Sequence, residues 1–257
     1  MQTDMTVGKP MKMILDFTIP VFIGNVFQQF YNMADAIIVG KFVGTKGLAA
    51  VGSTGTIMFL IIGFLTGLTA GFTVLTSQKF GAGKMDEMRQ SVGNAALLSI
   101  IISVIMTAIS MVGMHSLLTL MHTPEDIFQD AYTYIMIISA GIIATIFYNL
   151  FSSYLRAVGN SKIPLVFLVF SAALNVILDL VLIINFKMGV AGAAWATIIS
   201  QGVSAILCLV YIYIRMPSLA PNRRHWRLHG QESRNQLAMG SSLSTLPMSW
   251  ESPTKTC

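Results

Sequence analysis

The sequence predicts an all-α membrane protein whose six membrane-spanning helices form one bundle. The chain has 257 residues, of which 54% are hydrophobic and only 11% are charged, and its mean hydropathy is +0.70. Soluble domains carry about 25% charged residues, so this chain lacks the charge that a water-facing surface needs. It also contains six mostly apolar runs that each exceed 20 residues. About 20 residues of α-helix cross the hydrocarbon core of a bilayer, so each run predicts one span.

The first two runs carry structural signals beyond their length. Twelve mostly polar residues precede Met13–Val39. This run is too long for a signal-peptide core, so we expect it to stay in the mature protein. Pro20 removes one of its backbone hydrogen bonds, which predicts a bend and a hinge position. The second run, Leu48–Gln78, has glycines at four-residue spacing from Gly63 to Gly71, a pattern that lets a neighbouring helix approach closely.

Short segments connect the other four runs and leave no room for a domain outside the membrane. We expect residues 13–215 to form one six-helix lobe. Residues 1–12 would be a cytoplasmic N-terminus, and residues 216–240 a cytoplasmic connection that follows the lobe. The four runs are Val92–Met114, Tyr132–Leu155, Ile163–Phe186 and Val190–Ile214.

The basic residues gather in alternate connections. If the N-terminus is cytoplasmic, 13 of the 16 lysines and arginines lie on the cytoplasmic side, and only Lys41, Lys46 and Lys187 lie outside. The positive-inside rule therefore predicts a multi-pass protein with both termini in the cytoplasm. This distribution accounts for the net charge of +5 without nucleic acid as a partner.

Two acids within the spans are candidate site residues. Asp35 and Asp179 each lie about 9–12 Å below the outer end of their helix, at 1.5 Å per residue. A charge at the centre of a bilayer costs roughly 2.5–3.5 kcal/mol, so such acids face the bundle interior and indicate function by default. Asn175 shares a helix face with Asp179, and Thr197 lies at similar depth. These oxygen ligands suit Na⁺ or H⁺; the alternative is that the acids are neutral and only hold helices together.

Other polar side chains indicate either a wet cavity or hydrogen bonds between helices. Besides the possible Na⁺ site, no spacing of metal ligands occurs, and no catalytic residues are indicated. The chain also has no phosphate-binding loop of the G-x-x-x-x-G-K-[ST] type, so we expect no ATP motor and no organic cofactor. The candidate cavity residues are Gln28, Gln29, Asn32, Tyr148 and Asn149.

These residues form a pattern that resembles the N-terminal half of bacterial multidrug and toxic compound extrusion (MATE) transporters, over about residues 5–240. The matching features are Pro20, Asn32-Met-Ala-Asp-Ala-Ile-Ile-Val-Gly40, Gly47-Leu-Ala-Ala-Val-Gly52, Leu155-Arg-Ala-Val-Gly-Asn160 with Pro164, and Asn175-Val-Ile-Leu-Asp179. The resemblance implies one lobe of a twelve-helix antiporter in the bacterial plasma membrane. Such a transporter expels organic, cationic drugs in exchange for Na⁺ or H⁺. The resemblance implies that Asp35, Asn175, Asp179 and Thr197 form the coupling-ion site.

The C-terminal part departs from this family pattern. After residue 240 the sequence loses both helical period and apolar length. We therefore expect residues 241–257 to be a disordered tail foreign to the family, as a frameshift near codon 240 would produce. The chain would then lack the C-terminal lobe. Its expected partners are membrane lipid, a small organic substrate, and either that second lobe or a second copy of the chain.

Three other functions compete with drug export. A lipid or polysaccharide flippase of the same superfamily would need a positively lined cavity, and the paired acids argue against it. An inert membrane fragment is the second alternative. The third is an intramembrane aspartyl protease. Such enzymes resemble one another in Tyr-Asp and Gly-x-Gly-Asp motifs. Here Asp35 follows Ala34 and Asp179 follows Leu178, which argues against that enzyme.

Overall fold

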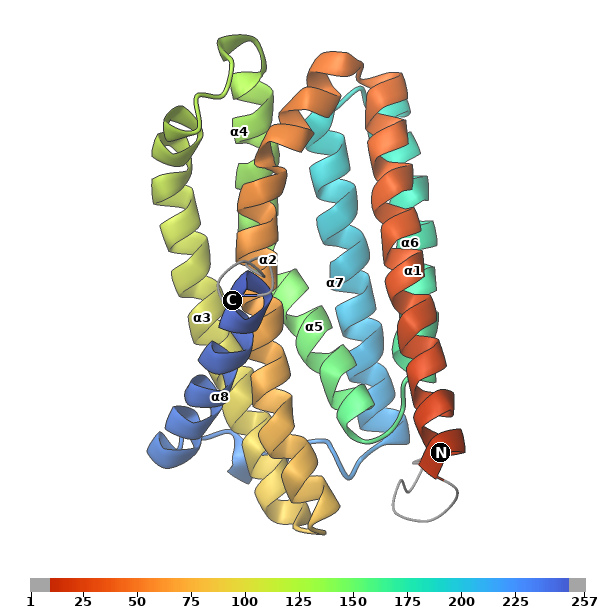
Figure 1. Cartoon of the computed structure of the whole chain (residues 1–257), viewed down its shortest axis with the longest axis vertical. Coiled ribbons are helices and arrows are strands. Elements are labelled where there is room, and N and C mark those ends of the chain that lie inside the picture. The colour runs from red at the N-terminus through yellow and green to blue at the C-terminus, as the bar shows by residue number, and fades with distance from the viewer. Residues whose placement is uncertain (1–9, 250–257) are drawn as a thin grey trace, which may run out of the picture.

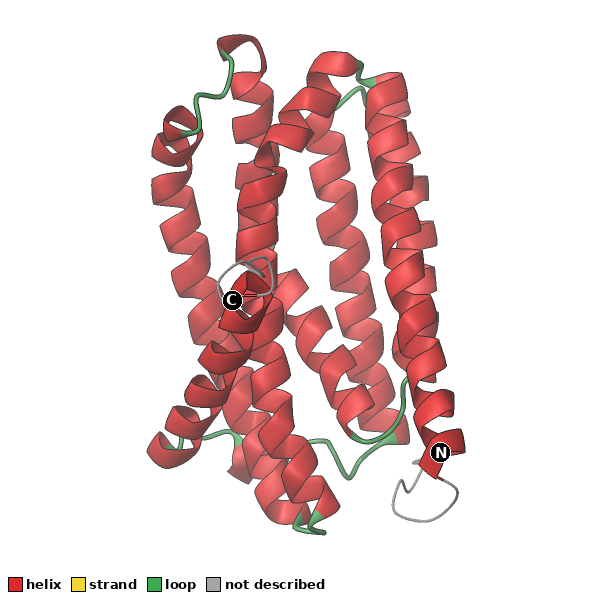
Figure 2. Ribbon diagram, viewed as in Figure 1, coloured by secondary structure: helices red, strands yellow, loops and turns green. Residues whose placement is uncertain are grey.

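A computed structural model describes residues 10–249, and the regular structure in this range is entirely helical (Figures 1 and 2). The predicted all-α fold class is confirmed. A π-helical segment, η1 (Val181–Asn185), extends the sixth helix, and a 3-10 turn, η2 (Arg223–His225), precedes the last one. The α-helices are α1 (Pro10–Phe42), α2 (Thr45–Gly81), α3 (Met85–Leu120), α4 (Glu125–Ala140), α5 (Ile142–Ala157), α6 (Lys162–Leu180), α7 (Val190–Arg215) and α8 (Gly230–Ser249).

Five of the six predicted spans have the length and composition to cross a membrane. Four are single helices: α2, α3, α6 with its η1 extension, and α7. The fifth is the pair α4 and α5, which meets the same criteria as one bent span. The sixth, α1, has 33 residues, but its described part is too polar for these criteria. It nevertheless packs along α6 in the bundle (Figure 1).

The fourth predicted span, Tyr132–Leu155, is bent where the sequence predicts one straight helix. α4 and α5 meet at Gly141 with an angle of 49° between them. Ile198 of α7 packs into this bend, and a Cβ at residue 141 would overlap its side chain. A single glycine among apolar residues leaves the hydropathy pattern intact, so the sequence gives no sign of the bend.

α8 lies against α2 and corrects the expected start of the disordered tail. The helix continues to Ser249, so residues 241–249 are helical rather than disordered. Residues 250–257 of the expected tail lie outside the described residues. Where the two helices cross, a Cβ on Gly71 would overlap the backbone of Gly240. Of the predicted packing glycines, Gly71 therefore allows α8 to approach α2 closely, whereas a Cβ on Gly63 would meet open space.

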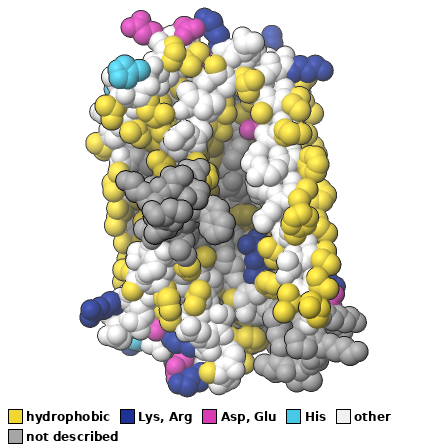
Figure 3. Space-filling model, in the orientation of Figure 1, with side chains coloured by type: hydrophobic (Ala, Val, Ile, Leu, Met, Phe, Trp, Pro, Cys, Tyr) yellow, Lys and Arg dark blue, Asp and Glu magenta, His cyan; other side chains and the backbone are white. Residues whose placement is uncertain are grey.

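Charged side chains gather at the two ends of the bundle, and hydrophobic side chains predominate between them (Figure 3). One end, called here the basic end, holds the start of α1, the α2–α3 and α5–α6 turns and the connection between α7 and α8 (Figure 1). Large apolar side chains are exposed between the ends; Val112 is 84% and Ile206 61% exposed. An apolar belt of this kind fits a multi-pass membrane protein.

Candidate cation site and polar cavity

A cavity of about 500 Å³ opens between α1, α2, α4, α5, α6 and α7. The face of the molecule drawn in Figure 3 is hollowed along its centre. An acidic side chain lies in the upper part of this hollow and basic side chains lie in its lower part. Among the described residues that line it, only Asp35 and Arg156 are charged. The rest of the polar lining consists of amides, hydroxyls and phenols, so the cavity can hold water and polar groups within the bundle.

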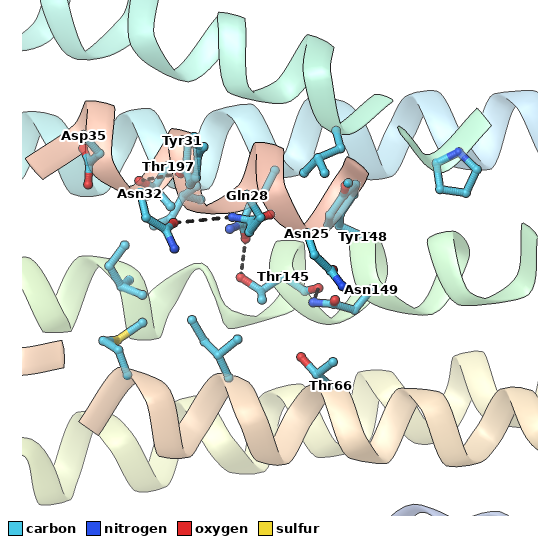
Figure 4. A pocket seen from close by; sticks show the side chains of 18 of the residues that line it. Asn25, Gln28, Tyr31, Asn32, Asp35, Thr66, Thr145, Tyr148, Asn149 and Thr197 are labelled. Atoms are coloured by element: carbon cyan, nitrogen blue, oxygen red, sulfur yellow. Dashed lines mark hydrogen bonds between the residues drawn. The ribbon is translucent and has the colours of Figure 1, made fainter. Parts of the chain in front are cut away.

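Polar residues at helical spacing on α1 form one wall of the cavity. Gln28, Tyr31, Asn32 and Asp35 all line it, and they are three or four positions apart. This spacing places side chains on one face of a helix. Figure 4 shows them in a row along α1, from the middle of the cavity to Asp35 at one end. Of the predicted cavity residues on this helix, Gln29 is absent from the lining. It is exposed because it lies about 100° around the helix from Gln28.

The two predicted acids lie on neighbouring helices, and Asp179 is farther from the cavity than Asp35. Asp35 on α1 is half-buried in the cavity wall, whereas Asp179 on α6 is 0% exposed. The acids are near enough for their charges to repel each other if both are ionised. The contact between α1 and α6 brings the acids together across more than 140 residues of sequence.

Thr197 of α7 joins the helices that carry the acids. Its Oγ1 accepts hydrogen bonds from the hydroxyl of Tyr31 on α1 and from Nδ2 of Asn175 on α6, both at 3.4 Å. Asn175 lies one turn before Asp179 and is also 0% exposed. The structure therefore places Asp35, Asn175, Asp179 and Thr197 in one cluster where α1, α6 and α7 meet.

Several oxygens of this cluster have no hydrogen-bond partner. Among the described residues, Oδ1 of Asp35, Oδ1 of Asn175 and both carboxylate oxygens of Asp179 are buried and unpaired. A buried polar atom without a partner costs about 1–3 kcal/mol, and more if it is charged. Four unpaired oxygens in one place are suited to a small hard cation or a proton, either of which would satisfy them.

A second wall, called here the polar wall, is built by α5 and α7 and includes residues that were not predicted from the sequence. Tyr148 and Asn149 line the cavity, as do Thr145 and Gln201. Thr145 Oγ1 donates to Gln201 Oε1 at 2.5 Å, and Asn149 Nδ2 donates to the carbonyl of Thr145 at 2.8 Å. A signal for both missed residues exists in the sequence. Thr145 is four positions before Asn149, and Gln201 is four after Thr197, so each shares a helix face with a predicted residue.

Two backbone features lie on the helices that carry the acids. The π-helical segment η1 begins two residues after Asp179; π-helical turns inside α-helices often mark functional sites. Pro20 lines the cavity fifteen residues before Asp35, and α1 continues through it as one helix. The role of Pro20 as a hinge therefore stays a prediction.

Known proteins resemble this chain over most of its length. Residues 20–181 match the family model described as MatE. The chain is 32% identical over 225 residues to the probable multidrug resistance protein YpnP of Bacillus subtilis, covering 87% of this chain and 51% of that protein. It is 27% identical over 208 residues to the probable multidrug resistance protein NorM of Thermotoga maritima, covering 79% and 45%. The chain thus spans about half the length of the curated relatives it matches.

Solved structures match the whole bundle. One is described as the outward-facing conformation of a multidrug resistance MATE family transporter of the MOP superfamily. Its TM-score is 0.86 at 29% identity, and the match covers 95% of this chain and 54% of that chain.

Proposed function

Because the chain belongs to the MATE family, we propose that it acts as the N-terminal lobe of an ion-coupled antiporter that exports drugs and other toxic organic compounds. MATE family members are transporters and not enzymes, which removes the intramembrane protease from the alternatives. The observation that carries the proposal is the group of unpaired carboxylate and amide oxygens beside a polar cavity.

The positions of the two acids support an order of binding. Asp35 faces the cavity, so a Na⁺ ion or a proton from the water in the cavity reaches it first. Asp179, Asn175 and Thr197 then supply further oxygens from α6 and α7. Binding neutralises charge between α1 and the other two helices. Because the Tyr31–Thr197 hydrogen bond also joins α1 to α7, the ion would change how α1 packs in the bundle.

The lining supports an organic cation as the exported compound. Asp35 is the acidic group that a substrate in the cavity can reach, among the described lining residues. If substrate and coupling ion both need this carboxylate, binding of one opposes binding of the other, as exchange requires. The amides and hydroxyls around it can accept varied polar groups. A flippase for anionic lipids would instead favour a predominantly basic lining, and the described lining holds one arginine.

Export requires a surface against which the lobe can move, because alternating access rocks one half of such a transporter against the other. The test therefore uses this chain fused to the C-terminal half of YpnP in a drug-sensitive bacterium. We expect ion-dependent efflux of a cationic dye from the fusion. Asp35→Asn or Asp179→Asn should abolish that efflux without reducing the amount of protein in the membrane. The matched control is Asp16→Asn, an exposed acid on the same helix, which should leave efflux intact.

Undiminished efflux in both site variants would contradict the proposed coupling site. Efflux that does not respond to Na⁺ or pH would contradict ion coupling. Efflux from cells that produce the 257-residue chain without any second half would show that one lobe suffices.

A further inference from the structure

A second hollow, of about 440 Å³, lies on α3, α5 and α7 and shares no lining residue with the polar cavity. We call it the apolar groove. Small residues, such as Ala144, Gly202 and Ala205, form its floor, and aromatic side chains, such as Phe147 and Phe151, form its walls. Small residues beside large ones create a channel with room for a slender apolar group, and nothing in the described part of the chain fills it.

The length of the groove corresponds to one leaflet of a bilayer. On α7 it extends from Gly202 to Tyr213. Eleven residues of helix rise about 16 Å, which is about half of the 30 Å hydrocarbon core. On α5 it begins at Ile143, just beyond the bend at Gly141. The groove therefore extends from the middle of the bundle to the basic end.

The groove is apolar along its length and amphipathic where it ends. None of its described lining residues is charged. The hydroxyl of Tyr154 donates to the carbonyl of Val92 at 3.5 Å, so this polar atom is directed inward. At the basic end the groove meets Tyr213 and Trp226, which are 46% and 42% exposed. Partly exposed Tyr and Trp side chains are typical of the boundary between hydrocarbon and lipid headgroups.

Basic residues surround this same end. Arg215 follows Tyr213 by two positions at the end of α7, and Arg227 follows Trp226 directly; both are exposed. Arg89 holds the connection in place, because its Nε donates to the carbonyl of Ser218 at 3.0 Å. Asp86, an acid at this end of the bundle, pairs with His225 at 3.3 Å and lines a different hollow.

We propose that the apolar groove binds one acyl chain of an anionic phospholipid, whose headgroup phosphate lies at Arg215 and Arg227. The chain fits the length and apolar lining of the groove, and the aromatic end provides the transition to the headgroup. Basic residues near a membrane surface attract anionic lipids by about 1 kcal/mol each. The bound lipid would cover the junction of α5, α7 and the connection, on the opposite side of α5 and α7 from the polar wall of the cavity.

Native mass spectrometry of the detergent-solubilised 257-residue chain tests the headgroup part of the proposal. The probes are dioleoyl phosphatidylglycerol and dioleoyl phosphatidylcholine, which have the same acyl chains. We expect one phosphatidylglycerol to bind more tightly than phosphatidylcholine. Arg215→Gln and Arg227→Gln should each weaken phosphatidylglycerol binding about fivefold, the factor equivalent to about 1 kcal/mol. The control, Arg234→Gln on the exposed face of α8, should leave it unchanged.

Filling the groove tests the acyl-chain part independently. At Gly202 a Cβ would lie 3.8 Å from that of Ala144, an ordinary contact, so Gly202→Leu fits the backbone and occupies the groove. It should weaken binding of both lipids about tenfold, because about two methylene groups of the acyl chain are displaced and each contributes about 0.8 kcal/mol. Gly113→Leu, at an exposed helix position with open space, is the matched control.

Equal binding of the two lipids, or arginine variants that bind like the unmodified chain, would overturn the assignment of the headgroup. Unchanged binding by a folded Gly202→Leu chain would overturn the assignment of the groove. If Gly202→Leu does not yield folded protein, Ala205→Leu replaces it, since Ala205 lines the same floor.

Discussion

Asp179 shows how the proposed site differs from the surrounding core. It is 0% exposed, and neither carboxylate oxygen has a hydrogen-bond partner among the described residues. Elsewhere in the core, some buried polar groups bond to one another, as Gln236 and Ser91 do. Outside the cluster, the other buried atoms without a partner in the described part of the chain are serine hydroxyls, such as those of Ser99 and Ser139, and none of them is a carboxylate. A buried carboxyl group that is left unpaired reduces the free energy of unfolding, so its presence indicates a ligand rather than a structural role.

Removal of this carboxyl group should therefore stabilise the lobe while it destroys the site. We predict that Asp179→Leu raises the free energy of unfolding by about 1–3 kcal/mol in ion-free buffer, because an apolar side chain of similar size replaces an unpaired polar one. Thermal unfolding in detergent measures the change. Asn175→Leu should not stabilise the lobe to the same extent, because it also removes the hydrogen bond to Thr197. A clear loss of stability in Asp179→Leu would show that the carboxyl group is structural.

At the residue scale, the sequence predicted the members of the cluster but not all of the cavity. Asp35, Asn175, Asp179 and Thr197 could be grouped because depth along a helix follows from residue number. Gln29 does not line the cavity of the described structure, since polarity alone does not say which face of a helix is directed inward. Gln201 shares a helix face with Thr197, but this predicts a cavity residue only once Thr197 is known to face the cavity.

At the scale of the elements, the bend between α4 and α5 positions the polar wall. It turns α5 so that Thr145, Tyr148 and Asn149 face the cavity, while Phe147 and Phe151 face the apolar groove. The sequence predicts one span here because both helices are apolar, and hydropathy does not reveal a change in the direction of the helix axis. The bend depends on a contact with Ile198 on α7, which is distant in the sequence.

A side chain at the bend should force the two helices apart. We predict that Gly141→Val lowers the free energy of unfolding by about 1–3 kcal/mol, the usual effect of overpacking. Gly63→Val is the control, because the structure has open space there. Thermal unfolding of both variants is the measurement. Ile198→Ala should recover part of the loss in a double variant; if it does not, the clash with Ile198 is not the cause.

The attachment of α8 depends on polar contacts, unlike the apolar packing between most of the spans. Gln236 is 0% exposed; its Nε2 donates to the carbonyl of Ser91 at 2.9 Å, and its Oε1 accepts from Asn94 Nδ2 at 2.9 Å. Lys79 and Glu232 form an ion pair of 2.8 Å beside them. The sequence marked this region only as a connection, because Gln and Ser residues give no periodic apolar signal.

Loss of Gln236 should release α8 from the bundle. We predict that Gln236→Ala costs about 1–3 kcal/mol of the docking free energy, because it leaves Asn94 and Ser91 with unpaired buried groups. Limited proteolysis of the 216–229 connection should then become at least several-fold faster. Gln231→Ala removes an amide from the exposed side of the same helix and should have no effect. Equal cleavage rates for the two variants would contradict this account of the docking.

For the whole molecule, the two ends of the bundle differ in basic residues, and this asymmetry predicts the topology. We expect single cysteines at Thr45 or Glu125 to react with a membrane-impermeant maleimide from outside intact cells, and a cysteine at Gly83 to be protected. Cys208 is buried and can remain, while Cys257 is replaced by serine. Labelling at residue 83 without cell lysis would show that the orientation is the reverse of the predicted one, or that an odd number of spans precedes this residue.

The all-α class and five of the six predicted spans followed from composition and run length, because a bilayer imposes those constraints directly on the sequence. The packing of the helices around the cavity did not, since it depends on contacts between distant residues such as Gly141 and Ile198. The chain also spans only about half the length of relatives such as YpnP. The predicted connection, residues 216–240, includes the first half of α8, which packs back on the lobe. The helix continues to Ser249, although the sequence predicted a foreign, disordered tail from residue 241.

The central claim is that Asp35 and Asp179, with Asn175 and Thr197, bind the coupling cation. The most direct test measures both ²²Na⁺ binding and proton uptake on acidification, for the 257-residue chain in lipid nanodiscs. We expect saturable binding of one cation per chain by at least one of these two measures. That binding should be lost in Asp35→Asn and in Asp179→Asn and retained in Asp16→Asn. Identical Na⁺ binding and proton uptake in the unmodified chain and both site variants would contradict the account.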